Sequence, residues 1–309
     1  MLNYELMAFL LKIESEYGTN PTPTGADNTM LVENFQLTPL QADQLDRTTL
    51  RTYGGAALAK LAGKHVAVAF DVPLAGSGAA GTAPAWGVAI RVCGFDETVV
   101  ESTSVTYALV DSGFESATGA FFIDGIQHLL TGMRGNATFR FNAHGIPYMR
   151  VEALALYTGP TAVALPTQDF SDFVAELTVE DDNTPTFTFA SHAGVMESLE
   201  LSAGVPVQYR SRINSEAVRQ TAARRGSGTL RIEEPAIGTK NFWTLAGGAA
   251  QTGQLVHGAS AGNIITVDWK AQILAGINRE NSEGVSLLNL PLRLVPTTAG
   301  YDELVLTLT

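Results

Sequence analysis

The feature that most constrains this fold is an alternation of period two near the end of the sequence. Leucine occupies every second position there, at Leu288, Leu290, Leu292 and Leu294. A period of two is that of a β-strand with one buried face. Pro291 lies inside the run and has no N–H for a strand ladder, so we expect an edge or a bulge at that position.

The rest of the sequence is punctuated as in all-β proteins. Its 30 glycines and 13 prolines are scattered between short apolar runs. Further strands are predicted at residues 66–72, 103–111, 138–141, 149–157, 229–233 and 304–308. Helices are predicted to be few and short, at residues 84–92, where Pro84 suits a first helical turn, and at residues 239–246.

The two halves of the sequence resemble each other. With about 150 residues per domain, 309 residues make about two domains, and a seam with glycine and proline lies at 158–168. The landmarks that recur in the same order on either side are Val68-Ala69-Phe70 and Leu230-Arg231-Ile232, Trp86 and Phe242-Trp243, and Gly135-Asn136 and Gly262-Asn263. We therefore predict an internal duplication, with domains at 1–165 and 166–309. Two unrelated β domains are the alternative.

Charge and cysteine content exclude several classes of protein. Charged residues make up 16% of the sequence, against about 25% in an average soluble protein, which indicates that other subunits cover much of the surface. The net charge of −12 argues against wrapping nucleic acid or lying on an anionic membrane. The single cysteine, Cys93, excludes an intrachain disulfide and a multi-cysteine zinc site.

Two glycine motifs fit cofactor-binding or catalytic patterns poorly. Residues 76–81 match G-x-G-x-x-G, but a dinucleotide fold needs a parallel sheet with alternating helices. Residues 258–262 match G-x-S-x-G, but a strand is predicted after them and no histidine follows His257. We therefore expect small-residue loops at both motifs, no catalytic, cofactor-binding or metal site, and no enzyme activity. A hydrolase that uses Ser260 is the last alternative.

Two runs of charge are candidates for interaction surfaces. One is acidic without a base, and its acids are Asp169, Asp172, Glu176, Glu180, Asp181 and Asp182. The other is basic with only Glu216 opposing, and its arginines are Arg210, Arg212, Arg219, Arg224 and Arg225. Each run can be a solvated surface. Alternatively, the two are complementary faces of neighbouring subunits that fix register.

Several stretches of the sequence resemble a known family. They are Lys12-Ile13-Glu14 with 17–28, the stretch 76–95 with Ala85-Trp86-Gly87 and Arg91-Val92-Cys93-Gly94-Phe95, the stretch 124–136 with Arg134-Gly135-Asn136, and 288–296 with Asp302-Glu303-Leu304. In this order they resemble the major tail tube proteins of long-tailed bacteriophages, siphophage-like members with two tube domains per chain. The resemblance covers essentially the whole chain, although no single motif in it is diagnostic.

The resemblance implies a mainly β fold, with two tandem β-sandwich or barrel tail-tube domains, each with a short flanking α-helix. Sheets of neighbouring subunits would join around a central channel, and two domains per chain imply homotrimeric rings with pseudo-six-fold symmetry. Closing the sheet around a ring also removes exposed strand edges. The function implied is structural. The rings stack into a hollow tail tube with an acidic lumen, through which DNA reaches the host without specific binding.

The resemblance also implies partners and locations. The partners are further copies of the chain, a tape-measure protein, and tail terminator and distal-tail or baseplate proteins, without a membrane. The chain would reside in the host cytoplasm during assembly and then in the virion tail. Rings of the family stack partly through a long hairpin and the terminal arm, and the corresponding segments here are residues 45–64 and 209–228. The candidate stacking bases on these segments are Arg47, Arg51, Arg210, Arg212, Arg224 and Arg225, with the acids of 169–182 as their partners.

Two other readings remain open beside the tail tube. A tail terminator, a distal-tail protein or another ring adaptor would share the barrel but form a single ring. A β-sandwich binding module, such as a carbohydrate binder, usually exposes several aromatic residues, and the sequence has only three tryptophans.

Overall fold

The computed structural model describes residues 3–309 and is mainly β, as the sequence predicts. The strands of the first half are β1 (Met7–Ile13), β2 (Glu33–Leu45), β3 (Lys60–Pro73), β4 (Phe95–Val100), β5 (Ser104–Leu109), β6 (Ala117–Ile123), β7 (Ile126–Asn142), β8 (Tyr148–Tyr157) and β9 (Thr161–Ala162). Those of the second half are β10 (Thr186–Phe189), β11 (Met196–Ser202), β12 (Val207–Arg212), β13 (Ser215–Gln220), β14 (Ser227–Glu233), β15 (Gln251–His257), β16 (Ile265–Ile273), β17 (Asn278–Ser282), β18 (Val285–Leu294) and β19 (Leu304–Leu308). All of their pairings are antiparallel.

The two halves repeat one order of paired strands. In the first half the order is β1-β6-β7-β8-β3-β2. In the second half it is β10-β15-β16-β18-β14-β11, with β17 continuing β16 along the edge of β18. The short strand β9 pairs with β7 as β19 pairs with β16. This order supports the internal duplication, while the division at 165 and 166 stays a prediction.

The registers place individual residues of the halves in correspondence. Val68 pairs with Ala153 and Leu37, and Leu230 pairs with Leu290 and Leu199. This matches Val68 to Leu230, as the sequence landmarks did. The match of Gly135-Asn136 to Gly262-Asn263 is wrong, because Asn136 pairs with Glu152 inside β7, whereas Asn263 precedes β16. The residue that stands where Asn136 does is Asn278, which pairs with Asn289 of β18.

Two seams join the halves within the chain. In the first, Leu201 and Leu199 of β11 pair with Phe139 and Phe141 at the end of β7. In the second, β19 pairs with β5, which belongs to the hairpin β4–β5 of the first half. Buried side chains of both halves therefore form one continuous core, which includes Phe70 and Trp86 as well as Trp269.

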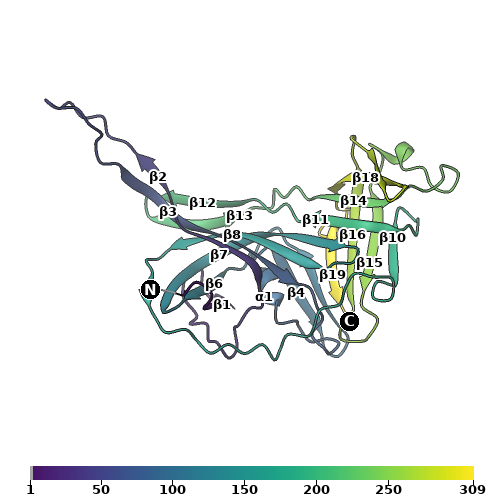
Figure 1. The fold of residues 1–309 in the computed structure, drawn as a ribbon, viewed down its shortest axis with the longest axis horizontal. Coiled ribbons are helices and arrows are strands. Elements are labelled where there is room, and N and C mark those ends of the chain that lie inside the picture. The colour runs from purple at the N-terminus through teal and green to yellow at the C-terminus, as the bar shows by residue number, and fades with distance from the viewer. Residues whose placement is uncertain (1–2) are drawn as a thin grey trace.

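Two hairpins leave the body of the molecule on the same side (Figure 1). Strands β2 and β3 form a long arm, tipped by residues 46–59, that projects away from the rest of the chain. Strands β12 and β13 form a separate two-stranded sheet that contacts β7, β8 and β3. By topology the second hairpin is the counterpart of the arm, since β11–β12 and β13–β14 occupy the places of β2 and β3.

The predicted strands agree with the structure better than the predicted helices do. Each predicted strand falls on an observed one, and 138–141 is the end of the 17-residue β7. The helix predicted at 84–92 is α1, only Gly87–Arg91. The prediction at 239–246 is wrong as an α-helix, since only a 3₁₀ turn, η1 (Trp243–Leu245), forms before the extended Ala246. So few residues cannot sustain a helix by propensity. Trp86 instead anchors α1, buried, with its indole N–H donating to the carbonyl of Ala75 at 2.8 Å.

Pro291 lies where β18 changes neighbours, as its missing N–H requires. On one side Pro291 faces Thr229 of β14. On the other, β17 pairs with β18 up to Asn289, and β16 pairs with it from Leu292 onward. Pro291 falls in the gap between them, where its carbonyl accepts from Leu274 at 2.8 Å. The expected irregularity is therefore the break between β16 and β17.

The two glycine motifs pack against each other. The N–H of Gly78 donates to the carbonyl of Gly262 at 2.9 Å, and the N–H of Gly76 donates to the side-chain oxygen of Asn263 at 2.7 Å. A Cβ on Gly76 would lie 2.1 Å from the carbonyl oxygen of Gly262. The glycines therefore permit a close backbone approach between a loop of each half, which gives both motifs a structural role.

We predict that Gly262→Ala destabilises the protein more than positive φ alone explains. Gly262 has φ +85°, and its Cβ would lie 2.5 Å from backbone atoms of the facing loop. Gly276→Ala is the matched control, since Gly276 has φ +99° with nothing within 4 Å. We expect the control to lose about 1–2 kcal/mol of unfolding free energy and Gly262→Ala to lose more, measured by denaturant unfolding. Equal losses would contradict the close approach.

Candidate assembly surfaces

The described part of the chain holds no group of three or more His, Cys, Asp or Glu residues placed to bind a metal ion. Cys93 lies in the core, where burial raises the pKa of its thiol above the usual range. No helix among residues 3–309 is long and apolar enough to cross a membrane. The features that stand out are surfaces: the arm, the second hairpin, an acidic linker and two strand edges.

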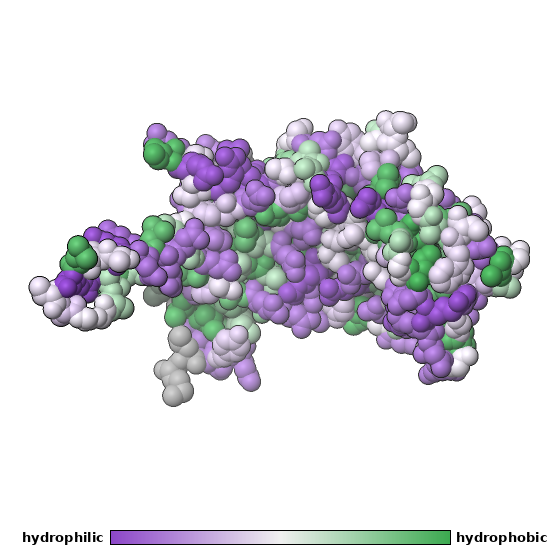
Figure 2. Space-filling model, turned by 90° about the horizontal axis from the view of Figure 1, so that it is seen from above, coloured by the Kyte–Doolittle hydropathy of each residue, from purple (hydrophilic) through white to green (hydrophobic). Residues whose placement is uncertain are grey.

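The arm exposes large apolar side chains that nothing in its own chain covers. They are Leu40, Leu45, Leu50, Tyr53, Leu58 and Leu61. Leu50 and Leu58 are 105% and 89% exposed, as in an extended peptide. Figure 2 shows apolar atoms at the end of this projection. Exposed apolar residues gathered on one projecting segment make the arm a candidate interaction surface.

Two candidate stacking bases, Arg47 and Arg51, lie at the tip of the arm and are exposed. The Nε of Arg51 donates to Thr49 at 3.0 Å, and its guanidinium lies over the ring of Tyr53 at 5.7 Å. Neither arginine is within ion-pair distance of a carboxylate in residues 3–309. Both charges are therefore available to an acid from outside the chain.

The second hairpin is docked on the first half by a small set of specific contacts. The side-chain amide of Gln220 donates to the carbonyls of Val92 and Gly135 at 2.8 and 2.7 Å. The N–H of Val218 donates to the hydroxyl of Tyr17 at 2.6 Å, and burial raises the pKa of that tyrosine. Val218 itself is fully buried.

Nearer its base, the second hairpin touches the first half at two further points. The ring of Tyr209 stacks on His65 with centroids 4.5 Å apart. The N–H of Val205 donates to the side-chain oxygen of Asn136 at 2.8 Å. The tip of the same hairpin is free: Arg210, Arg212 and Ile213 are exposed, and Ile213 is 94% so.

Arg224 and Arg225 are adjacent in sequence but have different environments. The Arg224 side chain is only 10% exposed and forms ion pairs with Asp111 and with Glu303, the latter at 2.5 Å. It fastens the second hairpin to the β5 and β19 seam. Arg225 is exposed and has no carboxylate within ion-pair distance in residues 3–309. Of the pair, only Arg225 is free to meet another chain.

The acidic run lies on the linker between the halves. Asp169, Asp172, Glu180, Asp181 and Asp182 are exposed, and Glu176 is half-buried. None of the six is paired with a base in the described residues. Hydrogen bonds from Ser171 lower the pKa of Asp169. In Figure 1 this linker runs along the lower side of the molecule, whereas both hairpins lie along the upper side. The basic and acidic candidates thus face opposite ways.

Two of the strands that are paired on one side only are β2 and β17. Strand β2 pairs only with β3, and β17 pairs only with β18, among the residues described. Arg279 holds β17 in place through a bidentate pair with Glu234 at 2.7 and 2.8 Å. Its guanidinium also lies over Trp243 at 4.8 Å. The edge of β17 is therefore rigidly presented.

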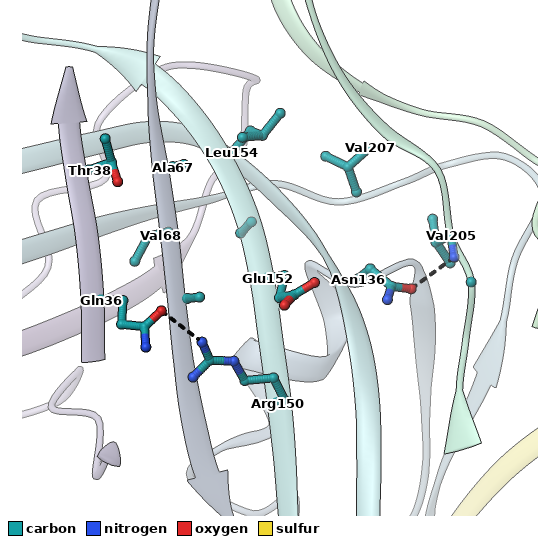
Figure 3. A pocket seen from close by; sticks show the side chains of 13 residues that line it. Gln36, Thr38, Ala67, Val68, Asn136, Arg150, Glu152, Leu154, Val205 and Val207 are labelled. Carbon is teal, nitrogen blue, oxygen red and sulfur yellow. Dashed lines mark hydrogen bonds between the residues drawn. The ribbon is translucent and has the colours of Figure 1, made fainter. Parts of the chain in front are cut away.

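An open groove of about 620 Å³ lies between β2, β3, β8 and the base of the second hairpin (Figure 3). Small apolar side chains form much of it, among them Ala67, Ala69 and Ala153. Arg150 donates to Gln36 at 3.2 Å and forms an ion pair with Asp71 at 3.1 Å. Arg150 is thus engaged with neighbouring side chains, whereas the carboxylate of Glu152, which also lines the groove, has no ion-pair partner among residues 3–309.

Comparison with known proteins adds no relative. No family model and no curated protein matches this chain. A functional assignment therefore rests on the residues and on their arrangement.

Sequence reasoning located the two hairpins and the acidic linker but missed other parts of these surfaces. It did not find the free edge of β17 or the docking contacts of Tyr17 and Gln220, which join residues about 200 and 130 positions apart. A signal was present for the arm, since Leu50, Tyr53 and Leu58 are apolar residues in a stretch without regular spacing.

We predict that Arg224→Leu destabilises the fold by about 3–5 kcal/mol, because it leaves a buried carboxylate unpaired. Glu303 is 4% exposed, and its Oε2 already lacks a hydrogen-bond partner. Arg225→Leu, at an exposed position, is the control, with an expected change within about 0.5 kcal/mol. Thermal and denaturant unfolding measure both. A small loss for Arg224→Leu would show that the ion pairs contribute little.

We predict that the stability of the fold depends on pH through the ionisation of the Glu234 carboxyl. Hydrogen bonds from Arg279 and then Ser286 lower the pKa of Glu234 to about 2, below the value of about 4.3 in unfolded chains. A lowered pKa stabilises the fold above the unfolded value, and this stabilisation is lost as pH falls through the folded pKa. Glu234→Gln should thus be less stable than the parent near pH 7 and converge with it as pH falls from 4.3 towards 2. Melting temperatures across this range measure it, and a constant gap would contradict it.

Proposed function

We propose that this chain is a structural protein that polymerises into rings and then into a hollow tube, the tail tube of a long-tailed bacteriophage. The resemblance in sequence supports this proposal, and so does the observation that the chain has a sheet seam it can repeat with a second copy. The proposed tube is a passive conduit without catalysis.

The repeatable seam follows from the duplication. Strand β11 pairs with β14 on one side and with β7 of the first half on the other. Its counterpart β2 pairs with β3 and has a free second edge. The counterpart of the end of β7 is β17, which also has a free edge. The β7–β11 seam inside the chain can therefore recur between chains, with β17 of one copy beside β2 of the next.

Recurrence of this seam produces a closed object. A head-to-tail contact between different surfaces gives a ring where the rotation closes. If the intrachain and interchain seams are alike, three chains form a ring of six similar halves, as the family resemblance implies. A closed ring leaves no free β2 or β17 edge, which accounts for the low charge fraction of 16%.

Stacking of such rings is supported by the placement of charge. The exposed bases Arg51, Arg210 and Arg212 lie on the tips of the two hairpins, which are at the upper side in Figure 1. The acids of 169–182 lie at the lower side. Rings stacked in one direction would bring the bases of one ring towards the acids of the next. Arg224 is not part of this proposal, because its pairs are internal.

The charge of the chain suits the transit of DNA. At −12 per chain, a ring repels phosphate wherever its acids face the channel. DNA and a tape-measure protein would thus pass without specific binding. Terminator and distal-tail or baseplate proteins would cap the two ends of the tube in the virion.

The experiment that tests this function is negative-stain electron microscopy of the purified chain across a concentration series. We expect rings and hollow tubes that lengthen with concentration. Single rings that never stack would favour a terminator or adaptor. Monodisperse single chains at every concentration would count against self-assembly and favour a binding module.

We predict that Thr38→Lys with Leu40→Lys prevents ring formation and leaves the fold intact. Both residues lie on the free part of β2 that corresponds to the paired part of β11, and lysine on an edge opposes strand addition. The concentration needed for assembly should rise about tenfold or more, since about 1.4 kcal/mol is a factor of ten. Thr239→Lys with Thr298→Lys adds the same charge at exposed loop positions outside both charged runs as a control. Sedimentation velocity measures the effect, and normal assembly of the β2 variant would exclude this edge from the seam.

A further inference from the structure

The chain contains two equivalent hairpins, and only one of them is docked. The segment 196–233, which carries the second hairpin, has nearly the same length as 33–73, which carries the arm, and both begin and end in paired strands of the same topology. The second hairpin lies on the first half of its own chain. The base of the arm meets Tyr209 through His65 of β3, whereas its tip, residues 46–59, projects free of the body (Figure 1).

The contacts of the docked hairpin identify the positions at which the arm would dock on a second half. Tyr209 stacks on His65, and one of its ring carbons is also 3.6 Å from the Cβ that Gly63 would carry. Val205 donates to Asn136. The strand registers place Arg225, Ser227 and Asn278 of the second half where Gly63, His65 and Asn136 stand in the first.

The residues of the second half are more exposed than their counterparts in the first half, as expected if no hairpin covers them. Gly63, His65 and Asn136 are half-buried, whereas Arg225, Ser227 and Asn278 are all exposed. The Asn278 side chain makes no hydrogen bond with residues 3–309, although its counterpart Asn136 accepts one from the docked hairpin. The second half thus carries the same strand positions as the first half, without the hairpin over them.

The exposed apolar residues of the arm fit the same explanation. On the first strand of each hairpin, Arg47 follows Leu37 by ten residues, as Tyr209 follows Leu199. Leu58 lies in the tip of the arm, residues 46–59. Leu58 is 89% exposed in the single chain. A docked arm would bury Leu58 and its apolar neighbours.

We propose that the arm docks on the second half of a second copy of this chain, across Arg225, Ser227 and Asn278, as the second hairpin docks on the first half. The occupant is the neighbour whose β17 pairs with β2, so the inference rests on the proposed self-assembly. The contact lies within one ring rather than between rings. It makes the two hairpins of each chain equivalent, and the upper face of the ring then presents a regular set of basic hairpin tips.

Engineered cysteines test this placement. The pair Arg47→Cys and Ser227→Cys corresponds to the stacked pair Tyr209 and His65, and the native Cys93 is fully buried and does not compete. We expect disulfides between chains under oxidation, seen as covalent oligomers on a denaturing gel that stop at the number of chains in one ring. The pair His65→Cys and Tyr209→Cys is the control and should crosslink within one chain.

Each outcome of the crosslinking decides a different point. A ladder that continues beyond the ring size would overturn the proposal, because it places the arm between rings. An intrachain disulfide, or normal rings in the microscope without any crosslink, would overturn it as well and leave the tube function standing. If the parent chain itself does not assemble, both the proposed tube function and the proposed docking of the arm are contradicted.

A second variant guards against a local effect of the cysteines. Asn278→Ala removes an exposed side chain that we expect to accept a hydrogen bond from the arm. In the single chain, this side chain has no hydrogen-bond partner among residues 3–309. We expect an unchanged melting temperature of the single chain and an assembly concentration raised severalfold. Thr298→Ala, at an exposed loop position, is the control. Equal assembly of both variants would count against docking at Asn278.

Discussion

The fold depends on the need of every strand edge for hydrogen-bonding partners. Backbone N–H and C=O groups at an edge must be paired or hydrated, and an exposed edge invites another strand. In this chain β11 and β19 of the second half pair with β7 and β5 of the first half. The seams merge two repeated units into one core. The same requirement leaves β2 and β17 unsatisfied, and it is the physical reason to expect a second copy.

Contacts other than strand pairing hold the seams in register. Gly76 and Gly262 permit two loops of opposite halves to approach at backbone distance. Arg224 ties the second hairpin to the β5 and β19 seam through two carboxylates, one of them buried. The guanidinium of Arg279 holds β17 through Glu234 and Trp243. These groups connect the elements on either side of each junction by contacts that do not depend on strand pairing.

The duplication is incomplete in an informative way. The hairpin β4–β5, which supplies the second seam, has no counterpart between η1 and β15 in the second half. A seam between chains built like the β7–β11 seam would therefore have one sheet connection where the intrachain junction has two. The arm is the larger of the two hairpins and carries more exposed apolar residues. Docking of the arm on a second copy would compensate for the strand pairing that a β4–β5 hairpin supplies within the chain. Contacts between chains would then rely on the arm, and contacts within a chain on β4–β5.

The sequence by itself determined the fold class, the positions of most strands and the irregularity at Pro291, because the alternation of side chains and a missing N–H act locally. It also predicted the repeated order of strands through landmarks such as Val68 and Leu230. It could not decide which residues meet across the seams. Arg224 and Arg225 are the same amino acid at neighbouring positions, and only the fold buries one against Glu303 and exposes the other. The counterpart of Asn136 was misplaced for the same reason, since strand register depends on partners far away in the sequence. Tertiary structure alone decided which edges and which hairpin were left free.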